Sequence, residues 1–337
     1  MSLWPAIILG ATLFVAYANG ANDNFKGVAT LFGSGTTDYS KALWWATVTT
    51  FAGSVAALFL ATELIATFQG KNLIPDFLSQ SPPFLAAVIL GAATTVMLAS
   101  KLGIPISTTH GLTGALLGAS IVAVGLQLGF QTLLTGFLVP LLVSPLLSVV
   151  LAIFGYPLLS RFAKAAGLSN DTCLCIATVP DSRAAATPSA SGIVETTPGL
   201  RVIMDQQVAC EQPLSGTLLG VNGQSVLDAA HYLSAGALSF ARGLNDTPKI
   251  VALGLIAAGL QMEWSIILIG LVMAMGGIIG ARKVAETVSK RITAMDPEQG
   301  LTANLITSVL VIFASKWGMP VSTTHVSCGA LFGIGIT

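Results

Sequence analysis

Charged side chains are scarce in this chain of 337 residues. Arg, Lys, Asp and Glu make up 9% of it, against about 25% in soluble domains, whereas 53% of the residues are hydrophobic and the mean hydropathy is +0.81. The 15 basic and 15 acidic residues cancel, so the chain lacks the positive excess that attracts nucleic acid. This composition predicts an integral membrane protein and excludes nucleic acid as a partner.

Cysteine is also scarce, with 4 residues in the whole chain. Cys173 and Cys175 with a distant Cys210 make a poor metal-binding pattern, so no metal site and no cofactor are predicted. We interpret these three as incidental thiols, with a structural disulfide or a redox role as alternatives, and Cys328 as a small packing residue. Residues 1–18 lack the basic region of a cleavable signal peptide and are expected to begin the first membrane segment.

Apolar runs of the length needed to cross a bilayer recur along the chain. A membrane-spanning helix needs roughly 20 apolar residues, and some runs here are short enough to be half-membrane segments. The expected fold is an all-α membrane protein with about 9–11 membrane segments, some of them broken helices and helical hairpins. The runs lie near 3–33, 42–60, 83–100, 105–125, 132–160, 231–260, 264–280, 302–315 and 320–337.

A polar stretch separates two apolar halves. The segment 164–228 is rich in Ser, Thr, Pro and Gly and is typical of an aqueous linker. Within it, the alternating residues Leu200–Met204 predict a short β-strand. The expected organisation is a first transmembrane repeat at 1–163, a polar cytoplasmic linker at 164–228, and a second transmembrane repeat at 229–337 that lacks a counterpart of 132–160.

Two polar motifs occur twice, in the same order. Ala99–His110 returns almost unchanged as Ala314–His325, 215 residues later, and Gly20–Lys26 matches Gly243–Lys249 at an offset of 223. Two motifs that recur in order indicate a duplicated unit. Polar and charged residues repeated inside very apolar sequence are typical of a transport site in a membrane protein.

The basic residues predict that the two halves are inverted. Residues 281–300 contain Arg282, Lys283, Lys290 and Arg291, whereas their counterpart 61–82 contains one basic residue, Lys71. Because basic loops stay in the cytoplasm, the two segments are expected on opposite sides of the membrane. The N-terminus is then outside, the linker is cytoplasmic, and the expected location is a multi-pass protein of the plasma or inner membrane.

The Gly-x-Asn-Asp motif predicts a helix break, expected near Asn19–Asp23 and Arg242–Asp246. Glycine and asparagine favour unwinding, and a new helix start presents free N–H groups and a positive dipole end to an anion. A carboxylate at membrane depth is costly, by roughly 2.5–3.5 kcal/mol on insertion scales. Lys26 and Lys249 lie three residues after the aspartates and are expected to pair with them. These pairs either face the substrate or only hold the fold together.

The second motif predicts a hairpin tip. Ser107–Thr109 and Ser322–Thr324 each follow a proline by two residues, so the serine is expected to cap a new helix. The alternative is that the hydroxyls only bond back to helix carbonyls. His110 and His325 close the motifs and are either proton carriers or groups that bond within the hairpin.

Further titratable residues are less informative. Glu63 and Glu286 correspond at the 223 offset and are either coupling groups or solvated residues near segment ends. His231 lies outside the repeated motifs and is interpreted as incidental.

The repeated residues are suited to a compact oxyanion. Helix N-termini, hydroxyls, amides and lysines all donate hydrogen bonds, whereas a carboxylate only accepts them. Phosphate keeps an O–H at pH 7 and can donate to an aspartate, which sulfate cannot do. The aspartates therefore favour phosphate over sulfate, unless both are neutralised by their lysines.

At these residues the chain resembles the inorganic phosphate transporter family, which consists of secondary carriers built from two inverted repeats. Each repeat of that family carries a Gly-x-Asn-Asp signature and a Pro-x-Ser-Thr-Thr-His hairpin, and the match covers about 1–160 and 230–337. The resemblance implies symport of phosphate with Na⁺ or H⁺, with the substrate held between the repeats. The residues carried over from it are Asn22, Asp23, Thr108, Thr109, Asn245, Asp246, Thr323 and Thr324.

One departure from the family pattern concerns the coupling ion. In sodium-coupled members the signature continues Gly-Ala-Asn-Asp-Val-Ala-Asn, whereas Lys26 and Lys249 occupy the last position here. An ammonium group in the space of a sodium ion supplies the same charge. This departure favours H⁺ over Na⁺ as the coupling ion.

The sequence thus predicts secondary active transport of inorganic phosphate by alternating access, with a permease for sulfate or another tetrahedral oxyanion as the alternative. A membrane-embedded enzyme is disfavoured, because the hydroxyls and imidazoles are adjacent on one backbone and present twice, and a channel is disfavoured because no repeated pore ring is present. Expected partners are phosphate or sulfate, the lipid bilayer and, as an open alternative, a second copy in a homodimer. The predicted substrate-binding residues are Asn22, Asp23, Lys26, Ser107, Thr108, Thr109, Asn245, Asp246, Lys249, Ser322, Thr323 and Thr324. The predicted coupling residues are Asp23, Asp246, His110, His325, Glu63 and Glu286.

Overall fold

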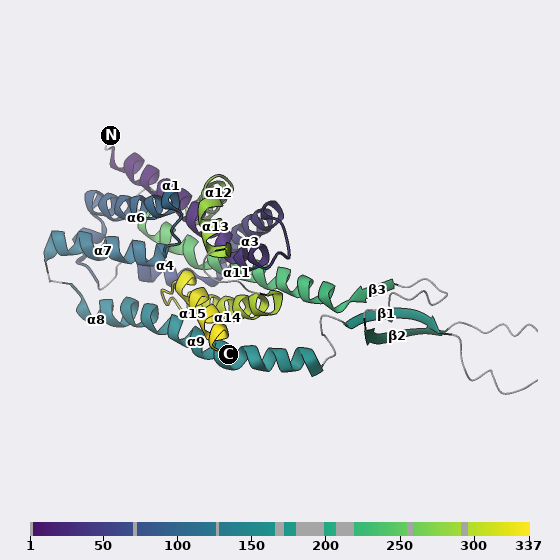
Figure 1. Cartoon of the computed structure of the whole chain (residues 1–337). Helices are drawn as coiled ribbons and strands as arrows, with labels where there is room; N and C mark the ends of the chain where they lie inside the picture. The colour runs from purple at the N-terminus through teal and green to yellow at the C-terminus, as the bar shows by residue number, and fades with distance from the viewer. Residues whose placement is uncertain are drawn as a thin grey trace, which may run out of the picture. The chain divides into compact units, whose positions relative to one another are not determined.

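The computed structural model describes residues 3–69, 73–125, 128–165, 172–179, 199–206, 219–254, 259–290 and 296–337. The chain divides into two compact units. The helical unit comprises Met1–Tyr156 and His231–Thr337, and the linker unit comprises Pro157–Ala230. Figure 1 shows helices throughout the first unit and strands in the second.

The helices of the first half follow one another with short connections. α1 ends where the 3₁₀ helix η1 begins, and the long helix α9 follows a short π-helical stretch, η2. The bounds are α1 Trp4–Asp23, η1 Asn24–Val28, α2 Ala29–Gly33, α3 Tyr39–Leu60, α4 Thr62–Phe68, α5 Asp76–Ser79, α6 Pro82–Leu102, α7 Thr108–Val124, α8 Phe130–Leu133, η2 Leu134–Leu138 and α9 Val139–Ala165.

The second half repeats this order from α11 onward. Its helices are α11 Gly223–Gly254, α12 Met262–Gly280, α13 Arg282–Lys290, α14 Pro297–Lys316 and α15 Thr323–Ile336. Among the described residues, five segments are long and apolar enough to cross a membrane, and α7 and α15 are shorter apolar helices. The five segments are Trp4–Gly33, Tyr39–Leu60, Pro82–Leu102, Phe130–Phe162 and Met262–Gly280.

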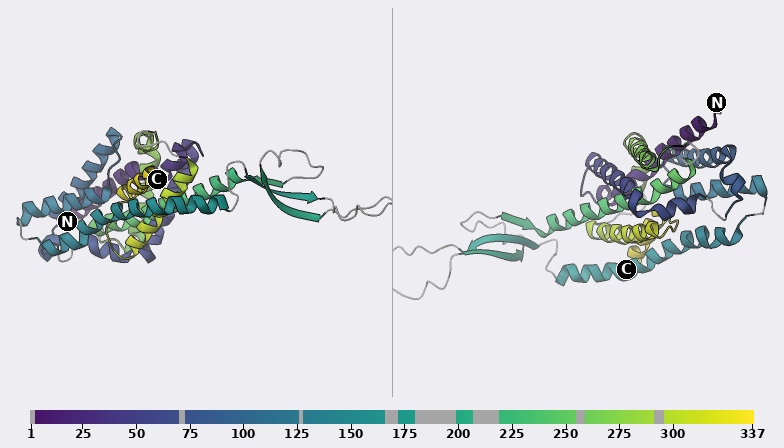
Figure 2. Two further views of the ribbon diagram at one scale, coloured as in Figure 1. Left: turned by 60° about the horizontal axis from the view of Figure 1, so that its bottom comes forward. Right: turned by 180° about the vertical axis from the view of Figure 1, so that it is seen from behind.

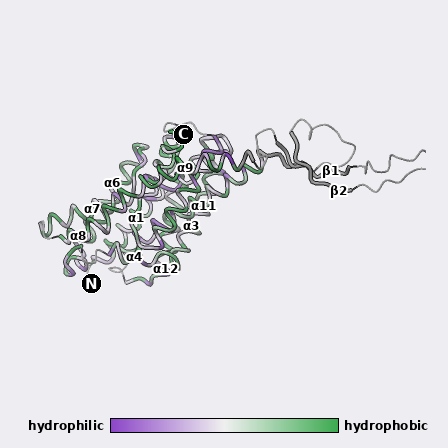
Figure 3. Tube along the Cα trace, turned by 90° about the horizontal axis from the view of Figure 1, so that it is seen from below, coloured by the Kyte–Doolittle hydropathy of each residue, from purple (hydrophilic) through white to green (hydrophobic). Residues whose placement is uncertain are grey.

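The outer surface of the helical unit is suited to lipid. Leu142, Leu146 and Phe154 on α9 are 66–72% exposed, although burying such side chains away from water is strongly favourable. Figure 3 shows apolar residues along most of these helices. The nearly all-helical architecture confirms the predicted fold class, and the chain is an integral membrane protein.

Each Ser-Thr-Thr-His motif starts the second helix of a hairpin, as predicted. α6 ends before Gly103, whose φ of 72° is the left-handed conformation that glycine adopts readily, and α14 ends before Gly318 with a φ of 68°. After a short non-helical segment, Ser107 caps α7 and Ser322 caps α15. In both caps the serine Oγ accepts a hydrogen bond from the histidine N–H three residues later.

The predicted helix breaks differ between the two copies. In the first copy α1 stays helical through Asp23, so the interruption expected at Asn19–Asp23 instead follows as η1, Asn24–Val28. In the second copy α11 is continuous and contains Pro248, so the interruption expected at Arg242–Asp246 is wrong. The Asn245 amide bonds to Val321 O of the hairpin at 3.3 Å. Its side chain is therefore not competing for the backbone of its own helix.

Two glycines place the first motif of each copy against the opposite copy. A Cβ on Gly20 would overlap the backbone of Met273 in α12, and a Cβ on Gly243 would overlap the backbone of Thr50 in α3. The 223 offset maps Gly20 onto Gly243 and Thr50 onto Met273, so the two contacts are reciprocal. Reciprocal contacts of this kind are typical of two copies related by a two-fold rotation.

The linker unit contains a small antiparallel sheet. Its strands are β1 Thr172–Val179, β2 Gly199–Gln206 and β3 Leu219–Asn222, in the order β2-β1-β3. Cys175 pairs with Ile203 in the register of β1 and β2, and both views in Figure 2 show the strands together. The strand predicted at Leu200–Met204 is confirmed as part of β2, whereas Cys210 lies outside the described residues.

Candidate functional site

Charged residues of both Gly-x-Asn-Asp motifs are buried in the helical unit. Asp23 and Asp246 are 3% exposed, Lys26 is 6% exposed and Lys249 is fully buried. Lys26 Nζ forms an ion pair with Asp23 Oδ1, and Lys249 Nζ lies 3.4 Å from Asp246 Oδ1. The predicted pairing of each aspartate with the lysine three residues later is confirmed.

Lys26 links its own motif to both hairpins. Its Nζ donates hydrogen bonds to Ile106 O at 2.6 Å and to Thr324 Oγ1 at 3.1 Å. Ile106 precedes α7 in the same copy, whereas Thr324 belongs to the first turn of α15 in the other copy. One ammonium group therefore contacts both halves of the chain.

Lys249 makes the same contacts with the copies exchanged. Its Nζ donates to Val321 O at 3.1 Å and to Thr109 Oγ1 at 2.6 Å. Val321 and Thr109 are the counterparts of Ile106 and Thr324 at the 215 offset. The site is therefore a symmetric cluster in which each lysine meets a threonine of the opposite copy.

The two motif asparagines attach the first motif to the hairpin of their own copy. Asn22 Nδ2 donates to Ser100 Oγ at 3.0 Å and to Ile104 O at 3.1 Å. Asn245 Oδ1 accepts from Ser315 Oγ at 3.2 Å, and Ser315 is the counterpart of Ser100. Because both amides are fully buried and bonded to protein groups, they position the hairpins.

Asn19 joins the two aspartates. Its Nδ2 lies 3.0 Å from Asp23 Oδ2 and 3.3 Å from Asp246 Oδ2, and it also donates to Thr108 Oγ1 at 3.0 Å. Thr108 Oγ1 in turn donates to Asp23 Oδ2 at 2.7 Å. Asn19 is not among the predicted site residues, because it precedes the Gly-x-Asn-Asp motif by one residue.

Arg242 occupies the position that matches Asn19 at the 223 offset. Its side chain is 2% exposed, and its Nη1 donates to Thr323 Oγ1 at 3.1 Å and lies 3.9 Å from Asp23 Oδ1. In the sequence, Arg242 marks only the edge of the predicted helix break at Arg242–Asp246. The aligned repeat is the signal that finds it, since a buried arginine stands where the other copy has an asparagine.

The hairpin serines and histidines bond to each other. Ser107 Oγ lies 2.9 Å from His110 Nδ1, and Ser322 Oγ lies 2.7 Å from His325 Nδ1. The imidazole rings are exposed, and their centroids are 4.5 Å apart. The serines therefore act as helix caps, and a coupling role for the histidines stays a prediction.

Three other titratable residues lie away from this cluster. Glu63 and Glu286 are exposed, and Glu286 Oε1 is 3.3 Å from Arg282 Nε. The structure does not bring these glutamates to the buried aspartates, because Glu63 is exposed in the first turn of α4 and Glu286 is exposed in the middle of α13. His231 is fully buried, with its Nε2 3.0 Å from Thr30 Oγ1, so it belongs to a buried polar network.

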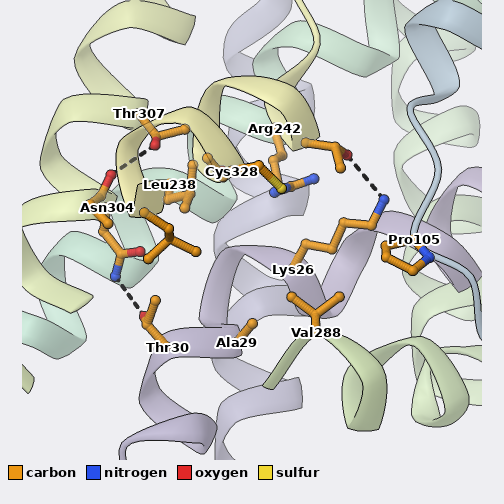
Figure 4. A pocket seen from close by; sticks show the side chains of 14 residues that line it. Lys26, Ala29, Thr30, Pro105, Leu238, Arg242, Val288, Asn304, Thr307 and Cys328 are labelled. Carbon is orange, nitrogen blue, oxygen red and sulfur yellow. Dashed lines mark hydrogen bonds between the residues drawn. The ribbon is translucent and has the colours of Figure 1, made fainter. Parts of the chain in front are cut away.

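Two cavities adjoin the cluster. The larger has a volume of about 40 Å³, room for roughly three water molecules, and the smaller, about 10 Å³, has room for about one. Figure 4 shows Lys26 and Arg242 near one end of the larger cavity and Thr30 and Asn304 near the other. The smaller cavity is lined by Asn19, Gly20, Asp23, Asn24, Thr50, Arg242, Asp246 and Met273.

The sequence model of the phosphate transporter family matches residues 19–337. The chain belongs to the phosphate transporter family. The matched region includes both copies of both motifs, so the family resemblance read from them is confirmed. Membership in a transporter family also agrees with the prediction that the chain is not an enzyme.

Individual relatives are distant but align over almost the whole chain. A protein of Thermococcus kodakarensis named as a candidate phosphate permease is 26% identical, covering 100% of this chain and 89% of that protein. The chloroplastic inorganic phosphate transporter 2-1 of Arabidopsis thaliana is 27% identical over an alignment that covers 96% of this chain and 64% of the transporter.

The solved structure of a sodium-dependent phosphate transporter superposes on this chain with a TM-score of 0.76 and 20% identity. The superposition covers 99% of this chain and 90% of that transporter. This likeness shows that the two proteins share a fold.

Proposed function

We propose that this member of the phosphate transporter family is a secondary active transporter that carries inorganic phosphate between its two repeats. The observation that carries the proposal is the exchanged pair of contacts, Lys26 to Thr324 and Lys249 to Thr109. An anion that accepts hydrogen bonds from these groups contacts both copies at once. Movement of one copy against the other then changes the access to the anion.

The donors and acceptors of the cluster are matched to phosphate. Ammonium groups and threonine hydroxyls donate to phosphate oxygens, and such charge-assisted bonds are stronger than neutral ones. Asp23 and Asp246 accept hydrogen bonds, so they favour an anion that still carries an O–H. Sulfate remains the alternative substrate, since each aspartate is already bonded to its lysine.

The proposed mechanism is alternating access between inverted repeats, with the two-fold axis in the membrane plane. The reciprocal packing of Gly20 and Gly243 supports the rotation. Arg282, Lys283 and Lys290 are exposed on α13 and support a cytoplasmic position for this helix. With this orientation the N-terminus is outside and the linker unit is cytoplasmic.

The proposed coupling ion is the proton. Lys26 and Lys249 place an ammonium group beside each aspartate, and this group supplies the charge that a metal cation would supply there. One observation favours sodium as a second candidate. The smaller cavity is lined by Asn19, Asn24 and Thr50. Within the described part of the chain, their side-chain oxygens Asn19 Oδ1, Asn24 Oδ1 and Thr50 Oγ1 have no hydrogen-bond partner, and hard cations bind such oxygens. Arg242 lines the same cavity, and its charge opposes a second cation.

Uptake by proteoliposomes tests the proposal. The purified chain is reconstituted, and uptake of labelled phosphate and labelled sulfate is measured with Na⁺ or choline outside and with or without an imposed pH gradient. We expect phosphate uptake that exceeds sulfate uptake, responds to the pH gradient and persists in choline. Lys249→Met serves as the inactive control. Strict dependence on Na⁺ would support the second candidate, whereas equal or greater uptake of sulfate would contradict phosphate as the substrate.

A further inference from the structure

Arg242 differs from its counterpart in the first copy, Asn19, so the cluster is not fully symmetric at this position. Asn19 Nδ2 donates to Thr108 Oγ1 at 3.0 Å, and Arg242 Nη1 donates to the matched Thr323 Oγ1 at 3.1 Å. The two residues therefore contact corresponding hydroxyls from corresponding positions. One is neutral and the other carries a charge, so the second copy contributes a cation that the first does not.

Among the described residues, no carboxylate is paired with Arg242 alone. Its closest acidic atom, Asp23 Oδ1, lies 3.9 Å away and already pairs with Lys26, and the other oxygen of Asp23 accepts from Thr108 and Asn19. Arg242 Nε is buried and has no hydrogen-bond partner among the residues that the structure describes. A buried charge and an unused N–H are costly unless a further acceptor is bound.

The ionisable residues of the cluster carry a positive excess. The two aspartates are balanced by the two lysines that pair with them, and Arg242 adds one more positive charge. An anion placed beside the guanidinium neutralises this excess. A guanidinium group also presents parallel N–H donors that match two oxygens of a phosphate group, which an asparagine cannot do.

The larger cavity lies beside Arg242 and Lys26. Its lining includes the polar residues Thr30, Asn304, Thr307 and Ser327. The repeat offsets map these four onto apolar residues that are 0–4% exposed within the main hydrophobic core. Those counterparts are Leu253, Ile89, Ala92 and Leu112.

We propose that Arg242, with Lys26 and Thr324, forms an oxyanion subsite in this cavity, and that Arg242 is a specificity-determining residue of the transporter. The inference rests on the proposed function, and it adds a ligand of the anion that only the second copy supplies. The anion is then held more tightly on the side of this cavity than on the opposite side, where packed apolar residues stand at the equivalent positions.

Cys328 provides a reporter for the subsite. It lines the same cavity and is a free thiol, half-buried, in the described part of the chain. In a full-length protein with Cys173, Cys175 and Cys210 changed to serine, labelling of Cys328 by N-ethylmaleimide is measured at increasing concentrations of inorganic phosphate. We expect phosphate to slow the labelling, because the bound anion fills the cavity.

Two substitutions separate the charge from the shape of the guanidinium group. Arg242→Asn introduces the residue found at the matched position of the first copy, and Arg242→Lys keeps the charge without the paired donors. We expect Arg242→Asn to raise the phosphate concentration for half-protection and the KM for uptake at least tenfold, and Arg242→Lys to raise both by a smaller factor. The control Arg282→Asn, at an exposed arginine, should change neither.

The outcomes distinguish this inference from the proposed function. If the unsubstituted protein takes up phosphate but Arg242→Asn shows unchanged protection and KM, the subsite is wrong and the transport function stands. If Arg242→Asn does not fold, the inference is tested by the protection of Cys328 in the unsubstituted protein and by the protection and KM of Arg242→Lys. Absence of labelling at Cys328, or labelling that phosphate does not slow, would then overturn the inference. Absence of phosphate uptake by the unsubstituted protein would overturn the proposed function itself.

Discussion

Removing the charge of Lys249 should destabilise the protein, and the distance between Lys249 and Asp246 sets the size of the effect. Lys249 Nζ is 3.4 Å from Asp246 Oδ1, and both side chains are almost fully buried. With an effective dielectric constant of about 20, two unit charges at this distance attract by about 5 kcal/mol. Breaking a buried pair by removing one partner typically costs about 3–5 kcal/mol, because the other charge is left uncompensated.

The assay is a double-mutant cycle with Lys249→Met, Asp246→Asn and the combined variant, read as melting temperature in detergent. At roughly 2 °C per kcal/mol, Lys249→Met should lower Tm by about 6–10 °C. The combined variant should recover much of this loss, because no buried charge is then left unpaired. The control is Lys41→Met, since Lys41 pairs with Asp38 at the surface and exposed pairs contribute about 0–1 kcal/mol.

Two results would refute this reasoning. A Lys249→Met variant as stable as the unsubstituted protein would mean that Asp246 does not depend on the lysine. A combined variant whose loss equals or exceeds the sum of the single losses would mean that the two side chains stabilise the fold independently.

Three further predictions follow from the packing, the caps and the carboxylates. Gly20→Ala should lower the free energy of unfolding by about 1–3 kcal/mol, because the added Cβ would overlap the backbone of Met273. The control Gly114→Ala, whose Cβ would meet no described atom within 4 Å, should be neutral or stabilise the protein by up to about 1 kcal/mol. Equal Tm values for the two variants would contradict this prediction. Ser107→Ala should lower the stability by about 1 kcal/mol through loss of the α7 cap, and an unchanged Tm would show that the cap contributes nothing. Asp23→Asn and Asp246→Asn should reduce phosphate uptake more than sulfate uptake, and equal losses would assign the aspartates to structure or coupling.

The parts of the site that the sequence predicted depend on local chemistry. The pairing of Asp23 with Lys26 follows from a spacing of three residues on one helix face. The caps at Ser107 and Ser322 follow from a serine placed shortly after a proline. Because both features recur in the second copy, the duplication itself made them stand out from ordinary membrane sequence.

The parts that it did not predict depend on contacts between distant segments. The aligned repeat shows that Arg242 stands in place of an asparagine, but its contacts with Thr323 and Asp23, which lie in other helices, come from the structure alone. The side chain of Asn245 in the continuous helix α11 bonds to a hairpin more than 70 residues away. Glu63 and Glu286 match each other in the repeat, but the register alone does not tell whether a matched pair faces the cluster or the surface.

Diffraction from crystals grown with arsenate tests the central claim most directly, because arsenate has the shape and charge of phosphate and arsenic gives an anomalous signal. We expect one strong anomalous peak per chain, within hydrogen-bonding distance of donors from both copies, among Lys26, Lys249, Thr109 and Thr324. A peak confined to one copy, or a peak only outside the helical unit, would contradict the claim that one tetrahedral anion is held between the repeats.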